Sequence, residues 1–316
     1  MTLLHTPVAV IGIGNMGLAM ALRLRDAGQA VRVHDIDLTR HALAAAAGAE
    51  LADSPAAAAA GCALLIVAVV DAAQTEVVLF GPAGAAAELP AGATVMLCPT
   101  IAPADVERLA QRLATASLGC LDAPMSGGPA RARDGSMSLM VAAPSALFAT
   151  HAPLLRHLAA RLFHVGQRPG DGARTKLVNN LLAATNLAAA AEAIALAQHL
   201  GLDGALTLAV ITQSSGHSWI GADRMARALA GDFAPRAHTT LLAKDSSLAL
   251  AMAAQASVRP VLGAQAAAMF QAALAAGYGG DDDARLLSLV SRQWQAAHRA
   301  PVPPDPPAPG SAQSAP

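Results

Sequence analysis

Lysine is rare in this chain. Of its 316 residues, 21 are lysine or arginine, and only two of these, Lys176 and Lys244, are lysines. Arginine is effectively always protonated in proteins and cannot serve as a base. A lysine can, because burial and a nearby positive charge both lower its pKa from about 10.4. Since the chain takes its ordinary positive charge from arginine, its two lysines are candidates for a more specific chemical role.

Lys176 and Asn180 have the spacing of a pair on one helix face. The apolar, alanine-rich segment 173–199 predicts a single long helix, and Gly201 would end it. Residues four apart lie on the same face, so the lysine amine and the asparagine amide would be neighbours. The amine could take a proton from an alcohol, or return it in the reverse reaction, while the amide holds the reacting hydroxyl. We expect both residues to be catalytic.

A glycine-rich turn near the N-terminus predicts a partner for that chemistry. The turn has the GxGxxG spacing, follows the apolar run 8–11 and opens a helical segment. Such glycines allow a tight turn, close approach of a pyrophosphate and packing of helix against strand. The N-terminal end of the helix also attracts phosphate groups. The residues expected to bind a dinucleotide, and so to place a hydride acceptor, are Gly12, Gly14, Asn15, Met16 and Gly17.

Asp35 follows the second apolar run, eighteen residues after Gly17. A carboxylate at that position can accept hydrogen bonds from ribose hydroxyls and would repel a 2′-phosphate. Asp37 competes for this role, and the nearest downstream arginine is Arg40. The sequence therefore predicts NAD as the cofactor, in preference to NADP, with Asp35 as the ribose ligand.

Short apolar runs alternate with helical segments through the first half of the chain. Strands are expected at 8–11, 30–34, 63–70, 94–97 and 118–122. This alternation predicts an α/β Rossmann domain, with a doubly wound, mostly parallel sheet covered by helices on both faces. After about residue 166 the apolar spacing becomes helical throughout, with no convincing strand. We therefore expect a long interdomain helix that leads into an all-α C-terminal domain.

The boundaries expected from this change of pattern give three parts. Residues 1–166 would form the dinucleotide-binding domain, and 167–300 the interdomain helix and the helical domain for substrate binding and dimerisation. The tail 301–316 is rich in proline, serine and alanine, and a segment of that kind cannot bury enough apolar surface to offset the entropy of ordering. We expect it to be disordered.

Composition argues against several classes of partner. The formal net charge is −1, so nothing predicts a nucleic-acid partner, which normally requires a basic patch. The longest clean apolar run, 62–70, is far shorter than the roughly 20 residues that cross a bilayer. The three cysteines lack a CxxC pair, and the N-terminus lacks the pattern of a signal peptide, so a cytoplasmic protein is expected. The ten histidines show no metal-binding spacing, and no metal is expected.

Three further stretches make the chain resemble one family. Residues 122–128 have the sequence Asp-Ala-Pro-Met-Ser-Gly-Gly, residues 172–180 fit a GxxxKxxNN pattern, and Lys244 precedes Asp245. Together with the glycine-rich turn, these stretches resemble the β-hydroxyacid dehydrogenases in the family's own order over most of residues 8–290. The resemblance implies NAD-dependent hydride transfer with Lys176 as acid/base, a Rossmann domain joined by a long helix to a helical domain, and a homodimer or homotetramer.

The resemblance also implies roles for individual residues. A loop would hold the substrate carboxylate through backbone N–H groups and a hydroxyl, and it consists of Ser126, Gly127 and Gly128. Lys244 would supply positive charge near cofactor or substrate, and Thr100 would lie near the nicotinamide, although Pro99 stands where serine is common. Trp219 would either line the pocket or pack in the core. The charged run at 131–134, beside the substrate loop, is interpreted as a solvated face.

The sequence leaves the substrate and two alternatives open. Candidate substrates are 3-hydroxyisobutyrate, tartronate semialdehyde and four-carbon sugar acids, and segment 214–224 is loosely similar to the L-threonate dehydrogenase branch. An imine reductase-like enzyme of the same fold usually replaces the lysine and prefers NADPH. A non-catalytic NAD-binding sensor would need no lysine and asparagine on one face. A decarboxylating 6-phosphogluconate dehydrogenase is excluded, because Asn179 and Ala183 stand where that class has histidine and glutamate.

Overall fold

The structure is a computed structural model that describes residues 6–299. Its first half is built on one nine-stranded sheet with the order β3-β2-β1-β4-β5-β6-β8-β7, and β9 pairs with β8. The six strands from β3 to β6 in this order run parallel, whereas β8 is antiparallel to β6 and β7. The strands are β1 (Val8–Ile11), β2 (Val31–His34), β3 (Glu50–Leu51), β4 (Leu64–Val67), β5 (Thr94–Leu97), β6 (Gly119–Asp122), β7 (Met125–Ser126), β8 (Ser138–Ala142) and β9 (Arg161–Gly166).

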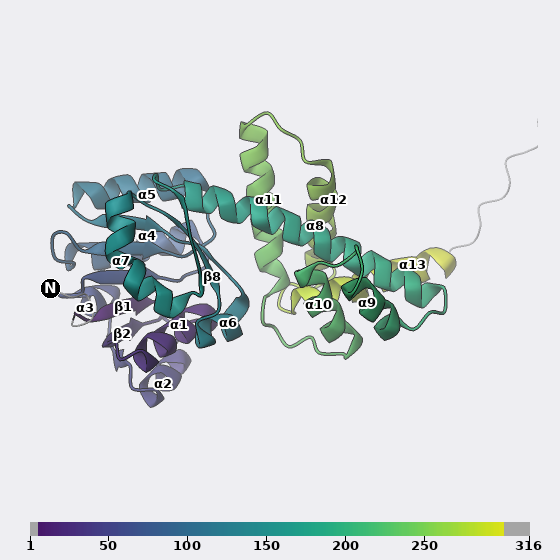
Figure 1. Ribbon diagram of the computed structural model, residues 1–316, viewed down its shortest axis with the longest axis horizontal. Coiled ribbons are helices and arrows are strands. Elements are labelled where there is room, and N and C mark those ends of the chain that lie inside the picture. The colour runs from purple at the N-terminus through teal and green to yellow at the C-terminus, as the bar shows by residue number, and fades with distance from the viewer. Residues whose placement is uncertain (1–5, 300–316) are drawn as a thin grey trace, which may run out of the picture.

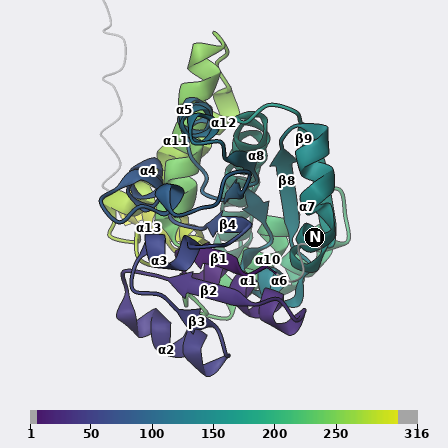
Figure 2. The ribbon, with the colours of Figure 1, turned by 90° about the vertical axis from the view of Figure 1, so that its left-hand side faces the viewer.

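Helices cover both faces of this sheet, as Figure 2 shows. Side chains of α1 and α7 bury one face, and side chains of α3, α4 and α5 bury the other. The central strands are apolar on both faces, as strands of a doubly covered parallel sheet must be. The helices are α1 (Asn15–Asp26), α2 (Leu38–Ala46), α3 (Pro55–Ala59), α4 (Ala72–Phe80), α5 (Pro103–Thr115), α6 (Gly128–Asp134) and α7 (Ser145–Leu158), with a 3₁₀ turn, η2 (Ala85–Ala87).

The expected doubly wound sheet is confirmed, with differences in its strands. The strands expected at 8–11 and 94–97 match β1 and β5, and the one expected at 63–70 is shorter, ending at Val67 as β4. Four strands were not predicted. β3 and β7 have two residues each, and β9 is a largely exposed edge strand, so none of these three has the apolar run of a buried strand. β8 is buried, but it has only five residues and begins soon after the charged run at 131–134.

The second half is helical, and one helix organises it. α8 (Asp171–His199) leaves the sheet and runs through the centre of this half (Figure 1). Each of the five other helices packs against α8, and alanines on α8 and its partners allow close approach. These helices are α9 (Gly204–Thr212), α10 (Trp219–Leu229), α11 (Thr239–Gln255), α12 (Val261–Ala275) and α13 (Leu286–Arg299), with a 3₁₀ turn, η3 (Asp283–Arg285). The expected long helix and helical second domain are therefore confirmed.

α8 combines length with an apolar composition. Among the described residues α8 is the one helix long and apolar enough to cross a membrane, with a mean hydropathy of 1.4 over its most apolar window. The core helix of a folded domain passes the same test, and five helices surround α8 here. The tail 301–316, expected to be disordered, lies outside the described residues.

Candidate active site

The glycine-rich turn joins β1 to α1, and each glycine of its motif is required for a different structural reason. Gly12 has a φ of +87°, and a Cβ there would lie 2.8 Å from the carbonyl oxygen of Ala68. A Cβ at Gly17 would overlap the carbonyl oxygen of Gly12, so helix and strand could not pack. Gly14 has nothing within 4 Å of its Cβ position, which leaves open space where a pyrophosphate would approach. The turn therefore fits the phosphates of a dinucleotide.

Asp35 is tied directly to this turn. One carboxylate oxygen accepts a hydrogen bond from the N–H of Ile13 at 2.7 Å, and the other accepts from the N–H of Asp37 at 2.9 Å. Asp37, the competing carboxylate, instead caps α2 by accepting from the N–H of Thr39. Arg40 pairs with Asp37 and donates to Asn15 in the glycine turn, at 3.4 Å. Asp35 thus lies beside the turn, where a ribose would follow the phosphates.

Lys176 and Asn180 are both buried on one face of α8, as their spacing predicts. The Asn180 amide donates a hydrogen bond of 2.6 Å to Asp245 on α11, and its oxygen accepts one from Asn179. Asp245 also pairs with Lys244, at 3.0 Å from carboxylate oxygen to amine. We call these residues the lysine cluster: Lys176, Asn180, Lys244 and Asp245. The amide of Asn180 keeps one N–H that could contact a substrate oxygen.

Burial governs the acid–base behaviour of Lys176. Burial is the main reason that the pKa of this amine falls to about 8; the negative charge of Asp245 opposes the shift, and the positive charge of Lys244 adds to it. Within residues 6–299 the amine has no hydrogen-bond partner. A lysine in this state carries a proton on some molecules and not on others near neutral pH. It can therefore donate or accept one without a large free-energy cost.

Lys244 connects the two halves of the protein. Its amine donates a hydrogen bond to the backbone carbonyl of Thr100, in the loop after β5. The contact brings α11 to the carboxyl ends of the parallel strands, where ligands of doubly wound sheets bind. Thr100 makes this contact through its backbone, so its hydroxyl remains available to a cofactor, despite Pro99 before it.

The expected substrate loop lies at the same edge of the sheet. Ser126 ends β7, and Gly127 and Gly128 follow with φ values of +131° and +75°. Residues other than glycine rarely adopt these φ angles, so both positions require glycine. The turn aims the chain into α6 and leaves the loop half-exposed, which suits a ligand-binding role.

Asp122 joins this loop to α8, the helix that carries Lys176. It ends β6 and is 1% exposed, and its carboxylate accepts hydrogen bonds from the N–H groups of Gly170 and Ala173, at 2.7 and 3.1 Å. Burial raises the pKa of Asp122 to about 6, although these hydrogen bonds lower it. The contact holds the first turn of α8 one turn before Lys176, and Asp122 is itself four residues before Ser126.

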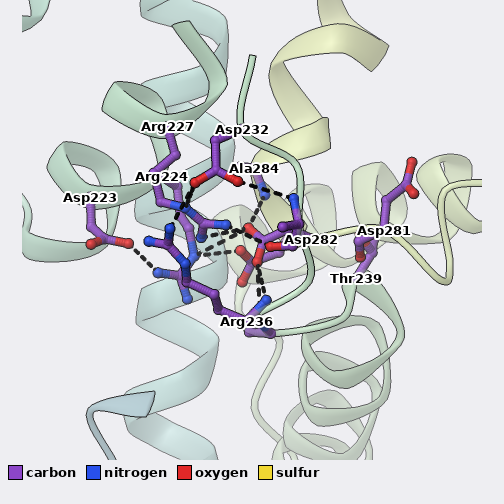
Figure 3. Close-up of polar contacts among 12 residues, drawn as sticks. Asp223, Arg224, Arg227, Asp232, Arg236, Thr239, Asp281, Asp282 and Ala284 are labelled. Carbon is purple, nitrogen blue, oxygen red and sulfur yellow. Dashed lines mark hydrogen bonds and ion pairs between the residues drawn. The ribbon is translucent and has the colours of Figure 1, made fainter. Parts of the chain in front are cut away.

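A second set of charges, buried at its centre and exposed at its rim, lies under α10, and Figure 3 shows it. Arg224 pairs with Asp223 and Asp283, Arg227 pairs with Asp282 at 3.0 Å, and Asp282 also accepts from the backbone N–H groups of residues 236 and 237. We call this set the arginine–aspartate network: Asp223, Arg224, Arg227, Asp232, Arg236, Asp282 and Asp283. It ties α10 to η3 and thereby fixes the position of Trp219, the first residue of α10.

Trp219 is 49% exposed and therefore is not an ordinary core residue. Within residues 6–299 no group of three or more histidine, cysteine or acidic side chains could hold a metal ion. Two members of the site had no assigned role in the sequence analysis. Asp122 begins the segment 122–128 and Asp245 follows Lys244, so both lie in segments that resemble the family. Only the folded chain shows which groups they contact.

The site and the fold together define a class of protein. A glycine turn after β1, a carboxylate after β2 and a buried lysine of lowered pKa on the connecting helix are the parts of an NAD-dependent dehydrogenase. Two family models match: the NAD-binding domain of 6-phosphogluconate dehydrogenase over residues 7–166, and the NAD-binding domain of NADP-dependent 3-hydroxyisobutyrate dehydrogenase over residues 170–290. The chain belongs to the β-hydroxyacid dehydrogenase family, and NAD is its cofactor.

Individual relatives are similar over nearly their whole length. L-threonate dehydrogenase of Cupriavidus necator is 38% identical over 89% of this chain and 95% of its own. 3-Hydroxyisobutyrate dehydrogenase of Pseudomonas aeruginosa is 34% identical over 84% and 91%. Among solved structures, 3-hydroxyisobutyrate dehydrogenase from Salmonella typhimurium has a TM-score of 0.85 and 34% identity, covering 90% of this chain and 99% of its own.

Proposed function

We propose that this enzyme oxidises a four-carbon sugar acid of the L-threonate type with NAD, using Lys176 as the acid/base. The observation that carries the acid/base role is the buried Lys176 amine, with a pKa of about 8, beside Asn180 on α8. The substrate class is supported by the 38% identity to L-threonate dehydrogenase over 89% of the chain. 3-Hydroxyisobutyrate and tartronate semialdehyde stay as the other candidate substrates.

The proposed roles follow from these positions. NAD supplies the hydride acceptor when it is bound. Lys176 takes the proton of the substrate hydroxyl as the carbon–hydrogen bond breaks, and Asn180 holds the same oxygen with its remaining N–H. In the reverse direction Lys176 returns the proton. Residues proposed to bind the substrate are Ser126, Gly127, Gly128, Trp219 and Lys244, and those proposed to bind the cofactor are Gly12, Gly14, Asn15, Met16, Gly17, Asp35, Thr100 and Lys244.

Asp35 supports a preference for NAD over NADP, because its carboxylate lies beside the glycine turn and would repel a 2′-phosphate. We further propose that residues 1–166 and 167–300 act as the cofactor and substrate domains, and that the enzyme works in the cytoplasm, since Cys62, Cys98 and Cys120 are all free.

We also propose that the enzyme is a homodimer or homotetramer assembled through its helical half. Apolar side chains are exposed on α8 and α12, which pack against each other, and large exposed apolar patches often mark interfaces. The four most exposed are Val178, Leu182, Val261 and Leu262, at 62%, 61%, 72% and 71%. Sedimentation velocity would detect the assembly, and a monomer at micromolar concentration would contradict it.

A substrate panel tests the function. The purified enzyme is mixed with NAD and, separately, L-threonate, 3-hydroxyisobutyrate or other small hydroxy acids, and NADH formation is followed by absorbance. We expect the highest kcat/KM with the four-carbon sugar acid. Reduction of cyclic imines without any hydroxy acid oxidation would favour an imine reductase. Tight NADH binding without turnover of any substrate would favour a sensor.

A further inference from the structure

Arg131 lies against the loop that is proposed to hold the substrate carboxylate. It is on α6, three residues after Gly128. The atoms nearest to a Cβ built on Gly127 are Cδ and Cβ of Arg131, at 2.9 and 3.1 Å. The arginine side chain therefore runs along the half-exposed face of the loop, and any larger residue at Gly127 would displace it.

The guanidinium end of Arg131 reaches the helical half of the protein. Its central carbon lies 5.1 Å from the centre of the Trp219 ring, within the range of a cation–π contact. Arg224 approaches the same ring at 6.0 Å. An arginine of α6 and an arginine of its own helix thus both approach the indole of Trp219, and the contact with Arg131 spans the two halves of the molecule beside the substrate loop.

The three nearby arginines differ in how their charge is neutralised. Arg224 pairs with Asp223 and Asp283, and Arg133, two residues after Arg131 on α6, pairs with Asp26 on α1. Arg131 forms no ion pair and no hydrogen bond with any side chain in residues 6–299; its side chain lies beside Gly127 and the ring of Trp219, and its charge acts weakly on the exposed Asp134. Its planar group of N–H donors is left free for a polar ligand.

We propose that Arg131 and Trp219 form the far wall of the substrate pocket, and that Arg131 selects polyhydroxylated acids by donating hydrogen bonds to their distal hydroxyls. This inference rests on the proposed function and deepens it. The serine–glycine loop and the lysine cluster serve the carboxylate and reacting hydroxyl that all substrates of this class share. Arg131 begins where that loop ends, so its donors contact the part of the substrate that differs. Trp219 holds the plane of the guanidinium and excludes water from one side of it.

The test compares two acids that each have a carboxylate and an oxidisable hydroxyl but differ in the number of hydroxyls: L-threonate has three and 3-hydroxyisobutyrate has one. For Arg131→Ala we expect kcat/KM with L-threonate to fall about 10- to 100-fold, mainly through KM, as for lost hydrogen bonds to a charged donor. The value with 3-hydroxyisobutyrate should change less than about threefold. Trp219→Ala should lower kcat/KM with L-threonate selectively as well, but by a smaller factor. Trp219→Phe should keep most of the wild-type preference for L-threonate. Arg133→Ala is the matched control and should leave both substrates unaffected.

Each result decides one question. A wild-type enzyme that prefers L-threonate and loses this preference in Arg131→Ala supports the inference. An equal loss with both acids would assign Arg131 to the shared carboxylate and overturn its role in selection. No loss with either acid, or a wild-type preference for 3-hydroxyisobutyrate, would also overturn it while leaving the dehydrogenase function intact. A wild-type enzyme that oxidises neither acid, nor any other hydroxy acid, would overturn the proposed function as well. Melting temperatures of the variants show whether they are folded.

Discussion

The helical half holds two sets of charges, each with a buried centre, that are built in opposite ways. The lysine cluster has two amines and one carboxylate, and Lys176 has no hydrogen-bond partner within the described residues. In the arginine–aspartate network, four carboxylates surround three guanidinium groups. The single carboxylate of Asp282 accepts hydrogen bonds from Arg227 and from the backbone N–H groups of residues 236 and 237. The lysine cluster therefore has too few hydrogen-bond and ion-pair partners for its charges, and the arginine–aspartate network has many.

The comparison separates a structural use of buried charge from a chemical one. A buried arginine surrounded by carboxylates stays charged at every accessible pH, so it fixes neighbouring elements and does nothing else. A buried lysine with too few partners has a pKa near neutrality, which costs stability but permits proton transfer. Substitutions in the two sets should therefore affect stability in different ways.

Replacing Asp282 should give the largest loss of stability. Asp282→Ala removes the acceptor of three backbone N–H groups, those of residues 236, 237 and 284. It also removes the buried partner of Arg227, which keeps only Asp232 and the carbonyl of Ala234. Breaking a buried pair in this way typically costs about 3–5 kcal/mol of unfolding free energy. Urea denaturation measures it, and Asp26→Ala, which breaks the half-exposed pair with Arg133, is the control and should cost less than about 1 kcal/mol. Equal effects of the two substitutions would remove the distinction between the network and surface pairs.

Lys176→Met should change the unfolding free energy in the opposite direction and stabilise the protein. The amine binds its proton less tightly in the folded state, with a pKa of about 8, than in the unfolded chain at 10.5. Below pH 8 both states are protonated and the full penalty applies, so the variant should be more stable there, by about 1–3 kcal/mol. Between pH 8 and 10.5 the wild type gains stability, and the difference should shrink. A variant less stable than wild type at pH 7 would show that Lys176 is adequately paired.

Asp122→Asn should have the smallest effect on stability. The N–H groups of Gly170 and Ala173 donate to the same carboxylate oxygen, which the amide oxygen of asparagine can replace. The amide nitrogen cannot accept a hydrogen bond, so the N–H of Gly172, which also bonds this carboxylate, loses its partner at a cost of about 1–2 kcal/mol at pH 7. The pKa of Asp122 is raised from 3.8 to about 6, so its titration lowers wild-type stability as pH rises between these values. The variant should lack that change. Because α8 carries Lys176, kcat should also fall while binding of NADH stays unchanged, and an unaltered kcat would exclude a positioning role for Asp122.

The sequence predicted those parts of the fold and site that depend on local pattern. The glycine turn, strands β1 and β5, and the face shared by Lys176 and Asn180 all follow from spacing within a few residues. The hydrogen bond from Asn180 to Asp245 spans 65 residues, and that from Gly170 to Asp122 spans 48, so no local period encodes them. Arg131 is exposed, as the interpretation of the charged run as a solvated face predicts, but the sequence cannot show that its guanidinium lies 5.1 Å from the ring of Trp219.

The most direct test of the acid/base role of Lys176 is the turnover of Lys176→Arg at saturating NAD and substrate, measured beside NADH binding by fluorescence. The substitution keeps the positive charge near Asp245 but removes a group that can release its proton near neutral pH. Loss of general acid/base catalysis typically costs about 10²- to 10⁴-fold in rate, or about 3–5 kcal/mol of barrier. We expect kcat to fall by that factor, with NADH affinity nearly unchanged. A variant that keeps more than about a tenth of the wild-type kcat would show that another group transfers the proton.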